Sequence, residues 1–265
     1  MSIKTPKEVV EATLEIGVNK IKATENIPRL LTLSVMAGAY VSLGGILSVI
    51  VGFGFPELTA GNPALQRFLS GSVFPVGLIL IVLLGTELFT GNNALLVPAF
   101  MHGRYTIWDV LKNWGIVYVG NFAGCLLFSY FMVYLVGLTA PDPWHSAIIN
   151  VSEAKVAMPW MVILLKGIGA NWCVCLAIWL ALTGHGLLEK MVGAWMPVMA
   201  FATLGYEHSI ANMFFISTGM MEGADVTVGQ FLFDNLLPAT IGNIIGGAIF
   251  VGCIHTRLHL KAKKS

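Results

Sequence analysis

The sequence predicts an all-α integral membrane protein whose chain crosses the bilayer six times. Hydrophobic residues make up 56% of the 265 residues and charged residues only 11%, whereas a soluble domain carries about 25% charged residues. The mean hydropathy is +0.79, and six apolar stretches reach the roughly 20 residues that a helix needs to span the hydrocarbon. The formal net charge of only +1 argues against a polybasic nucleic-acid-binding protein.

The six apolar stretches are predicted to be transmembrane helices, and two of them are unusual. They run approximately over residues 30–55, 68–100, 110–138, 158–182, 191–221 and 231–254. The second and the fifth are too long for a plain span and contain Glu87 and Glu207, so we expect both to be broken at membrane depth. We interpret the chain as one membrane domain, made of an N-terminal amphipathic helix (1–28), a six-span pore (29–255) and a basic tail (256–265).

Residues 6–27 are predicted to form the amphipathic helix that precedes the first span. Its apolar and small residues recur every three or four positions and fall on one face; they are Val10, Leu14, Gly17 and Ile21. Charged residues occupy a separate stripe that includes Glu8, Glu11, Glu15 and Lys22. Such a helix lies on the bilayer surface or contacts a neighbouring subunit, and the sequence leaves both alternatives open.

The distribution of basic residues predicts the orientation of the chain. Twelve Lys and Arg residues fall in the terminal segments and in loops on the same side of the membrane, whereas only Arg67 and Lys155 fall on the other side. Because basic loops remain in the cytoplasm, both termini are predicted to be cytoplasmic. The protein is expected in the cell (inner) membrane.

Two motifs recur in the same order in the two halves of the chain. The pattern Gly-x-Glu-x4-Asn begins at Gly85 and again at Gly205, and the pattern Asn-x6-Gly-Asn-x2-Gly begins at Asn113 and again at Asn235. Each half contains three spans, an odd number, so the halves must lie in opposite orientations. An inverted repeat of this kind predicts a functional site near the bilayer midplane, where the two broken helices meet.

His208 occupies the most informative position, beside Glu207 and near the expected break of the fifth span. An imidazole can accept or lend a proton where the surrounding lipid penalises charge; the alternative is a hydrogen-bonded core histidine. Thr90 occupies the corresponding break in the first half, and its hydroxyl can hydrogen-bond the imidazole or a passing anion or cap a helix end.

The glycines and glutamates of the first motif are assigned to the structure of the broken helices. These residues are Gly85, Glu87, Gly205 and Glu207. Because the two glutamates hold equivalent positions, we expect each carboxylate to accept hydrogen bonds from backbone N–H groups that the break exposes.

Other polar residues allow two interpretations. Lys155 precedes the fourth span, where it can attract anions or simply be a solvated loop lysine, and Asn171 and Lys166 lie within that span and must find polar partners. The cysteines lie in apolar runs and are expected in the core, without disulfide, metal site or cofactor; they are Cys125, Cys173, Cys175 and Cys253.

The residues suggest two alternative functions. Asn62-Pro63-Ala64 matches the tripeptide of aquaporins, but such a pore needs two copies, so we assign the single copy to a turn and keep a neutral-solute channel as the alternative. A membrane enzyme that uses Glu207 and His208 in acid–base chemistry would need a nucleophile or metal site that we do not find. No enzymatic activity is therefore expected.

Four motifs make the sequence resemble the formate/nitrite transporter family from about residue 37 to residue 252. They are Gly85-Thr-Glu-Leu-Phe-Thr-Gly-Asn92, Lys112-Asn-Trp114, Asn171-Trp-Cys-Val-Cys-Leu-Ala-Ile-Trp179 and Gly205-Tyr-Glu-His-Ser-Ile-Ala-Asn-Met213. The resemblance implies an aquaporin-like protomer in a homopentamer, with one pore per protomer. It also implies small monovalent anions as substrates, formate foremost and nitrite or hydrosulfide as alternatives, which pass as the anion or as the neutral acid together with a proton.

The resemblance further implies roles for individual residues. His208 becomes the central pore histidine with Thr90 opposite it, Lys155 becomes a lysine of the outer vestibule, and Asn171 and Asn212 become polar wall residues. The implied apolar constrictions, which by composition alone are ordinary lipid-facing or core residues, are Phe74, Leu78, Leu88, Phe89 and Phe201.

In two places the sequence departs from the family pattern. Gly91-Asn92-Asn93 stands where some formate channels carry Ser-Thr or Ser-Ser, which leaves the selectivity open, and Lys166 replaces an expected apolar residue.

In the expected mechanism a basic vestibule concentrates the anion, and an apolar constriction opposes its bare charge. Protonation near His208 then converts formate to neutral formic acid, so transport should steepen toward acid pH.

Overall fold

The computed structural model describes residues 3–260, and every regular element among them is a helix. Six helices within this part of the chain are long and apolar enough to cross a membrane, which confirms the predicted number of spans. Their bounds are Ile27–Phe53, Pro63–Leu84, Ile107–Tyr134, Trp160–Thr183, Leu187–Leu204 and Gln230–His259.

Several spans are built from more than one helical segment. The first, fourth and fifth spans are single helices: α2 (Ile27–Phe53), α10 (Trp160–Thr183) and α11 (Leu187–Leu204). The second span consists of α4 (Pro63–Val73) and α5 (Val76–Leu84), and the third of α8 (Ile107–Phe128) and the π-helical Ser129–Tyr134. The sixth span consists of the π-helical Gln230–Leu236, α13 (Leu237–Ile244), the π-helical Ile245–Cys253 and α14 (Ile254–His259). The shorter helices are α1 (Pro6–Lys22), the 3-10 turn Ala23–Glu25, α3 (Pro56–Thr59), α6 (Phe89–Leu95), α7 (Val97–Met101), α9 (Trp144–Ala157) and α12 (Ser209–Met221).

Local sequence determines where several of these helices begin. The Asn26 side chain accepts a hydrogen bond from the Arg29 N–H (3.1 Å) at the start of α2, which satisfies one of the N–H groups that a helix start leaves free. The tripeptide that we assign to a turn straddles a helix start: the N–H of Asn62 closes a turn on the carbonyl oxygen of Thr59 (2.9 Å), whereas Pro63 is the first residue of α4. Proline suits this position because its fixed φ angle matches the helix and its missing N–H is not needed there.

Glycines bring the first span against the third and the fourth against the sixth. A Cβ atom at Gly124 would clash with the carbonyl oxygen of Val35, and one at Gly246 would clash with that of Ile168. Small residues allow helix backbones in a membrane to approach closely. Both halves of the chain therefore use the same kind of contact between their first and third spans.

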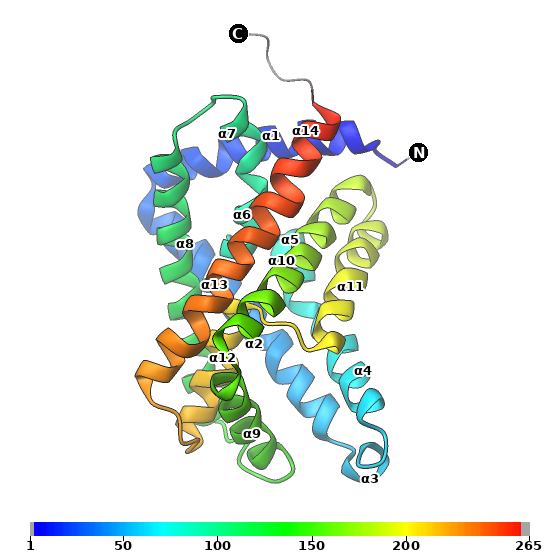
Figure 1. Cartoon of the computed structure of the whole chain (residues 1–265), viewed down its shortest axis with the longest axis vertical. Helices are drawn as coiled ribbons and strands as arrows, with labels where there is room; N and C mark the ends of the chain where they lie inside the picture. The colour runs from blue at the N-terminus through cyan, green and yellow to red at the C-terminus, as the bar shows by residue number, and fades with distance from the viewer. Residues whose placement is uncertain (1–2, 261–265) are drawn as a thin grey trace.

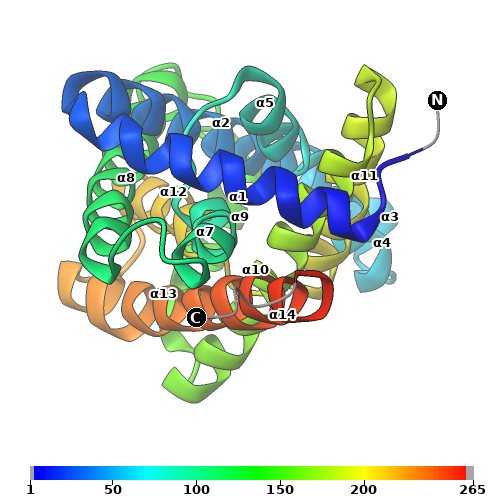
Figure 2. The same ribbon diagram turned by 90° about the horizontal axis from the view of Figure 1, so that it is seen from above.

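The N-terminal helix α1 packs on the chain's own bundle. It lies across one end of the spans (Figures 1 and 2), with Val9, Val10, Thr13 and Gly17 buried. A Cβ atom at Gly17 would lie 2.8 Å from the carbonyl oxygen of Leu95. The amphipathic face is therefore used for packing within the protomer, an arrangement that neither sequence-based alternative included.

Helices α1 and α14 lie at the same end of the molecule, and α3 and α9 lie at the opposite end (Figure 1). We call these the proximal and the distal end. The predicted basic tail begins within α14, and its residues 261–265 lie outside the described part of the chain.

Candidate functional site

The second and the fifth span both end at a left-handed glycine, after which the chain runs without helix for three residues. Gly85 (φ 67°) directly follows the last residue of α5, and α6 begins at Phe89. Gly205 (φ 69°) directly follows the last residue of α11, and α12 begins at Ser209. Neither glycine would bring a Cβ atom within 4 Å of another group. Glycine is therefore needed here for its backbone conformation rather than for space.

Replacing Gly205 by alanine is expected to lower the free energy of unfolding in detergent by about 1–2 kcal/mol, because a Cβ atom strains the left-handed conformation. Thermal unfolding of the purified protein measures this change. Gly61 is the matched control, since it too has open space around its Cβ position but no left-handed φ. Equal losses in Gly205→Ala and Gly61→Ala would contradict the conformational explanation.

Two buried asparagines hold the backbone of the breaks. Asn121 donates to the carbonyl oxygen of Glu87 (2.8 Å) and accepts from the N–H of Phe89 (2.9 Å). Asn243 makes the equivalent bonds in the second half, donating to the carbonyl oxygen of Glu207 (3.0 Å) and accepting from the N–H of Ser209 (2.8 Å). A backbone without helical bonds is thus satisfied by side chains at a depth where water is scarce.

The two glutamates have other partners than predicted. We expected their carboxylates to accept from backbone N–H groups, but they accept from lysine and asparagine side chains. Glu87 binds Lys20 Nζ and Asn92 Nδ2, both at 2.8 Å.

The second carboxylate repeats this pattern. Glu207 binds Lys155 Nζ (2.9 and 3.1 Å) and Asn212 Nδ2 (2.7 Å). The prediction failed because the asparagines of the third and sixth spans already serve the exposed backbone, which leaves each carboxylate to pair with a lysine.

His208 and Thr90 meet where the two breaks face each other. Their Nε2 and Oγ1 atoms are 2.9 Å apart, and both side chains are buried. The other ring nitrogen, Nδ1, accepts a hydrogen bond from the N–H of Ala211 (3.1 Å). Because Nδ1 is an acceptor, the neutral imidazole carries its hydrogen on Nε2 and donates it to Thr90.

A narrow apolar chamber lies beside His208. Its volume is about 20 Å³, and His208 is the only polar residue among the described residues that line it. Phe74 and Phe201 stand at one side of it, with ring centroids 5.7 Å apart, and Phe201 stacks on His208 at 5.9 Å. Since one water needs about 10–15 Å³, the chamber holds little more than a water molecule. The remaining lining residues are Val41, Gly77, Leu78, Ile81, Leu88, Val174 and Val198.

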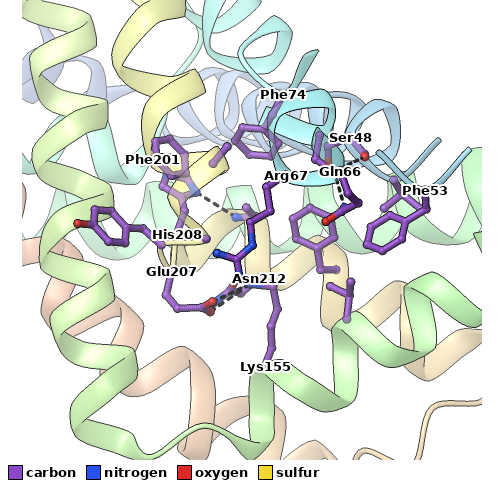
Figure 3. Close-up of a pocket in the computed structure, with 18 residues that line it drawn as sticks. Ser48, Phe53, Gln66, Arg67, Phe74, Lys155, Phe201, Glu207, His208 and Asn212 are labelled. Carbon is purple, nitrogen blue, oxygen red and sulfur yellow. Dashed lines mark hydrogen bonds and ion pairs between the residues drawn. The ribbon is translucent and has the colours of Figure 1, made fainter. Parts of the chain in front are cut away.

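Wider vestibules lie on either side of the chamber. The distal vestibule, about 220 Å³, is lined by Arg67, Lys155, Glu207, Asn212 and His208 among others (Figure 3). The proximal vestibule, about 650 Å³, lies beside α1, and Lys20 and Glu87 are among its lining residues. The distal vestibule, the chamber and the proximal vestibule thus follow one another from the distal to the proximal end of the molecule.

Three of the predicted pore residues do not line these cavities: Thr90, which contacts His208, and Phe89 and Asn171. Phe89 packs edge-on against Tyr118 (centroids 4.9 Å apart) and Trp114 (6.1 Å). Asn171 is buried and donates to the carbonyl oxygens of Thr90 (3.1 Å) and Asn243 (2.7 Å). In this structure the side chains of Phe89 and Asn171 therefore pack behind the residues that line the cavities.

Known proteins that are similar to this chain identify its family. The profile of the formate/nitrite transporter family matches residues 7–257. The chain belongs to this family. A probable formate transporter of Methanothermobacter thermautotrophicus is 38% identical over 275 residues, which cover 98% of each chain.

Solved structures of the family superimpose on the chain. For an FNT family ion channel the TM-score is 0.86 at 28% identity, covering 94% of this chain and 97% of the other. For a pentameric formate channel with formate bound it is 0.78 at 28% identity, covering 90% and 100%. This member of the formate/nitrite transporter family is therefore a multi-pass membrane transport protein.

Sequence reasoning missed several residues of the site in this family member. Asn121 and Asn243 stood in the repeated Gly-Asn-x2-Gly pattern, so their recurrence in both halves was the signal that pointed to them. Neither Lys20 nor Arg67 lies in a repeated motif. Their positions in the two vestibules depend on how α1 and α4 pack, which the sequence pattern does not state.

Proposed function

We propose that the protein is a homopentameric channel or transporter for small monovalent anions, with formate as the favoured substrate and one pore in each protomer. Nitrite and hydrosulfide are alternative substrates of the same pore. Support comes from a relative named as a probable formate transporter and from a structural neighbour that is a pentameric formate channel with formate bound.

The observation that carries this proposal is the apolar chamber with one polar side chain between two vestibules that contain charged groups. A bare anion loses its hydration in such a chamber at high cost. The Nε2–H group of His208 is directed at Thr90, 2.9 Å away, and an anion that enters beside His208 can share this donor. The small volume of the chamber favours formate over larger carboxylates.

The proton is assigned to the permeating acid. A formate ion that takes up a proton in the vestibule becomes neutral formic acid, crosses the constriction without a net charge, and releases the proton on the other side. His208, with Nδ1 already bound to the Ala211 N–H, provides a neutral hydrogen-bonding group along this path. Thr90 keeps the ring in the orientation that presents Nε2–H.

The distal vestibule is assigned to the outside of the cell and the proximal vestibule to the cytoplasm. The basic residues that surround the proximal end support this orientation through the positive-inside rule. In this proposal the protein lies in the cell (inner) membrane with both termini in the cytoplasm.

Formate flux into proteoliposomes is expected to be faster at about pH 5 than at about pH 8 under a fixed formate gradient, because more of the substrate is then protonated. Entry of the neutral acid should also acidify the lumen, which an enclosed pH dye reports. Protein-free liposomes correct for formic acid that crosses the lipid unaided.

The same preparation tests selectivity. Nitrite and hydrosulfide fluxes rank the alternative anions, and swelling in glycerol tests the neutral-solute alternative. Equal formate flux at both pH values would contradict the coupling to protons, and glycerol permeation without any anion flux would replace the proposed substrate class.

A further inference from the structure

We propose that Arg67 is the residue that captures the anion in the distal vestibule, while Lys155 serves to hold Glu207 in place. This inference deepens the proposed function and rests on it. The balance of charge among the residues that line the vestibule supports it.

Three ionised side chains are among the described residues that line this cavity: Arg67, Lys155 and Glu207. Lys155 Nζ lies 2.9 and 3.1 Å from the two carboxylate oxygens of Glu207, and the side chains are only 14% and 3% exposed. A lysine paired so closely with a buried carboxylate attracts a distant anion only weakly, because the fields of the two opposite charges cancel at longer range.

The ion pair is also fixed by further contacts. Glu207 accepts from Asn212 (2.7 Å) and Asn235 (3.4 Å), and Lys155 lies 5.5 Å from the ring centroid of Phe215. Releasing Lys155 to bind a substrate would leave the buried Glu207 without its partner, which is costly. The pair therefore belongs to the wall of the cavity.

Arg67 has the opposite surroundings. It extends from α4 into the vestibule (Figure 3) and is exposed. Within the described residues 3–260, no carboxylate lies within ion-pair distance of its guanidinium group, and no hydrogen bond engages its side chain. Arg67 thus supplies the uncompensated positive charge of this cavity.

The chemistry of a guanidinium group fits a small carboxylate. Its planar array of N–H donors can bind both oxygens of one carboxylate at the same time. A positive charge at the mouth of a pore also raises the local concentration of anions and their rate of entry. Formate that arrives from the distal side would therefore meet Arg67 before it reaches the aromatic pair Phe74 and Phe201.

The test compares formate entry from the two faces of the membrane. Formate is added over a range of concentrations to the outside of right-side-out and inverted membrane vesicles that contain the full-length protein, and its entry is measured. In Arg67→Gln, the half-saturating concentration is expected to rise about threefold to tenfold from the distal face only, with the maximal rate retained. Arg67→Lys should recover part of this loss because it keeps the charge without the planar fork.

Arg257→Gln is the matched control, because Arg257 is exposed on α14 at the proximal end. A second readout is salt: raising the ionic strength from about 0.01 to 0.15 M should slow distal entry in the wild type and have a smaller effect in Arg67→Gln, since salt screens an exposed charge.

An unchanged half-saturating concentration in Arg67→Gln, or equal changes on both faces, would overturn the role of Arg67 and leave the proposed function intact. A wild-type protein that carries no saturable flux of formate, nitrite or hydrosulfide from either face would overturn both proposals. Yield and pentamer content of each variant, measured in detergent, separate a folding defect from a loss of capture, and Arg67→Lys provides the comparison if Arg67→Gln assembles poorly.

Discussion

Replacing Asn243 by leucine is expected to destabilise the protein by on the order of 3 kcal/mol or more. The side chain of Asn243 binds the carbonyl oxygens of Gly167 (2.8 Å) and Glu207 (3.0 Å) and the N–H of Ser209 (2.8 Å). Leucine leaves the carbonyl oxygen of Glu207 and the N–H of Ser209 buried without a partner, and each such group costs about 1–3 kcal/mol. The carbonyl oxygen of Gly167 lies inside α10 and keeps its helical bond. Thermal unfolding and yield in detergent measure the loss.

The matched control for this change is Asn62→Leu. Asn62 is exposed, and its side chain donates to the carbonyl oxygen of Leu58 on the surface (3.0 Å), so its replacement should change stability by less than about 1 kcal/mol. Asn121→Leu should reproduce the loss seen at Asn243, because Asn121 serves the first break in the same way. Comparable stability of the Asn243 and Asn62 variants would show that the break does not depend on this asparagine.

Replacing His208 by asparagine is expected to lower formate uptake about tenfold or more while the protein still assembles. An asparagine oxygen can take the place of Nδ1 and keep the bond to the Ala211 N–H at the start of α12. The donor that faces Thr90 is lost. A buried acceptor left without its donor costs about 1–3 kcal/mol, which corresponds to roughly a fivefold to hundredfold change in rate.

His102→Asn is the matched control for this second change. His102 bonds the carbonyl oxygen of Pro98 through Nδ1 (2.8 Å) on the proximal side, and it does not line the chamber or either vestibule. Uptake should remain close to the wild-type level in this variant. Unchanged uptake in His208→Asn, measured at pH 5 in the proteoliposome assay, would rule out the imidazole as a group that the permeating species needs.

Hydrophobic length and repeated motifs were enough to predict the number of spans and the position of both breaks. A stretch such as residues 191–221 is too long for one span and carries Glu207 in its interior, and the structure ends α11 and begins α12 on either side of this glutamate. These features are local, because they depend on how many consecutive residues can face lipid and on where a backbone needs glycine.

Partners of the buried polar groups could not be predicted in the same way. Lys20 and Glu87 are far apart in the sequence, as are Lys155 and Glu207, yet each pair lies within 2.9 Å. Phe89 looked like a constriction residue but packs against Tyr118, because the start of α6 turns this ring toward α8. Such contacts depend on the relative placement of whole helices.

The sequence by itself determined that this protein is a six-span membrane protein with two interrupted helices and a histidine beside one interruption, because hydrophobicity, charge and glycine act along the chain. Only the tertiary structure decided which charges cancel and which do not. Lys155 and Arg67 are both isolated basic residues in the sequence, but folding places a buried carboxylate against Lys155 and leaves Arg67 exposed in the same vestibule. The electrostatic field that an anion meets depends on these distances, which no linear pattern contains.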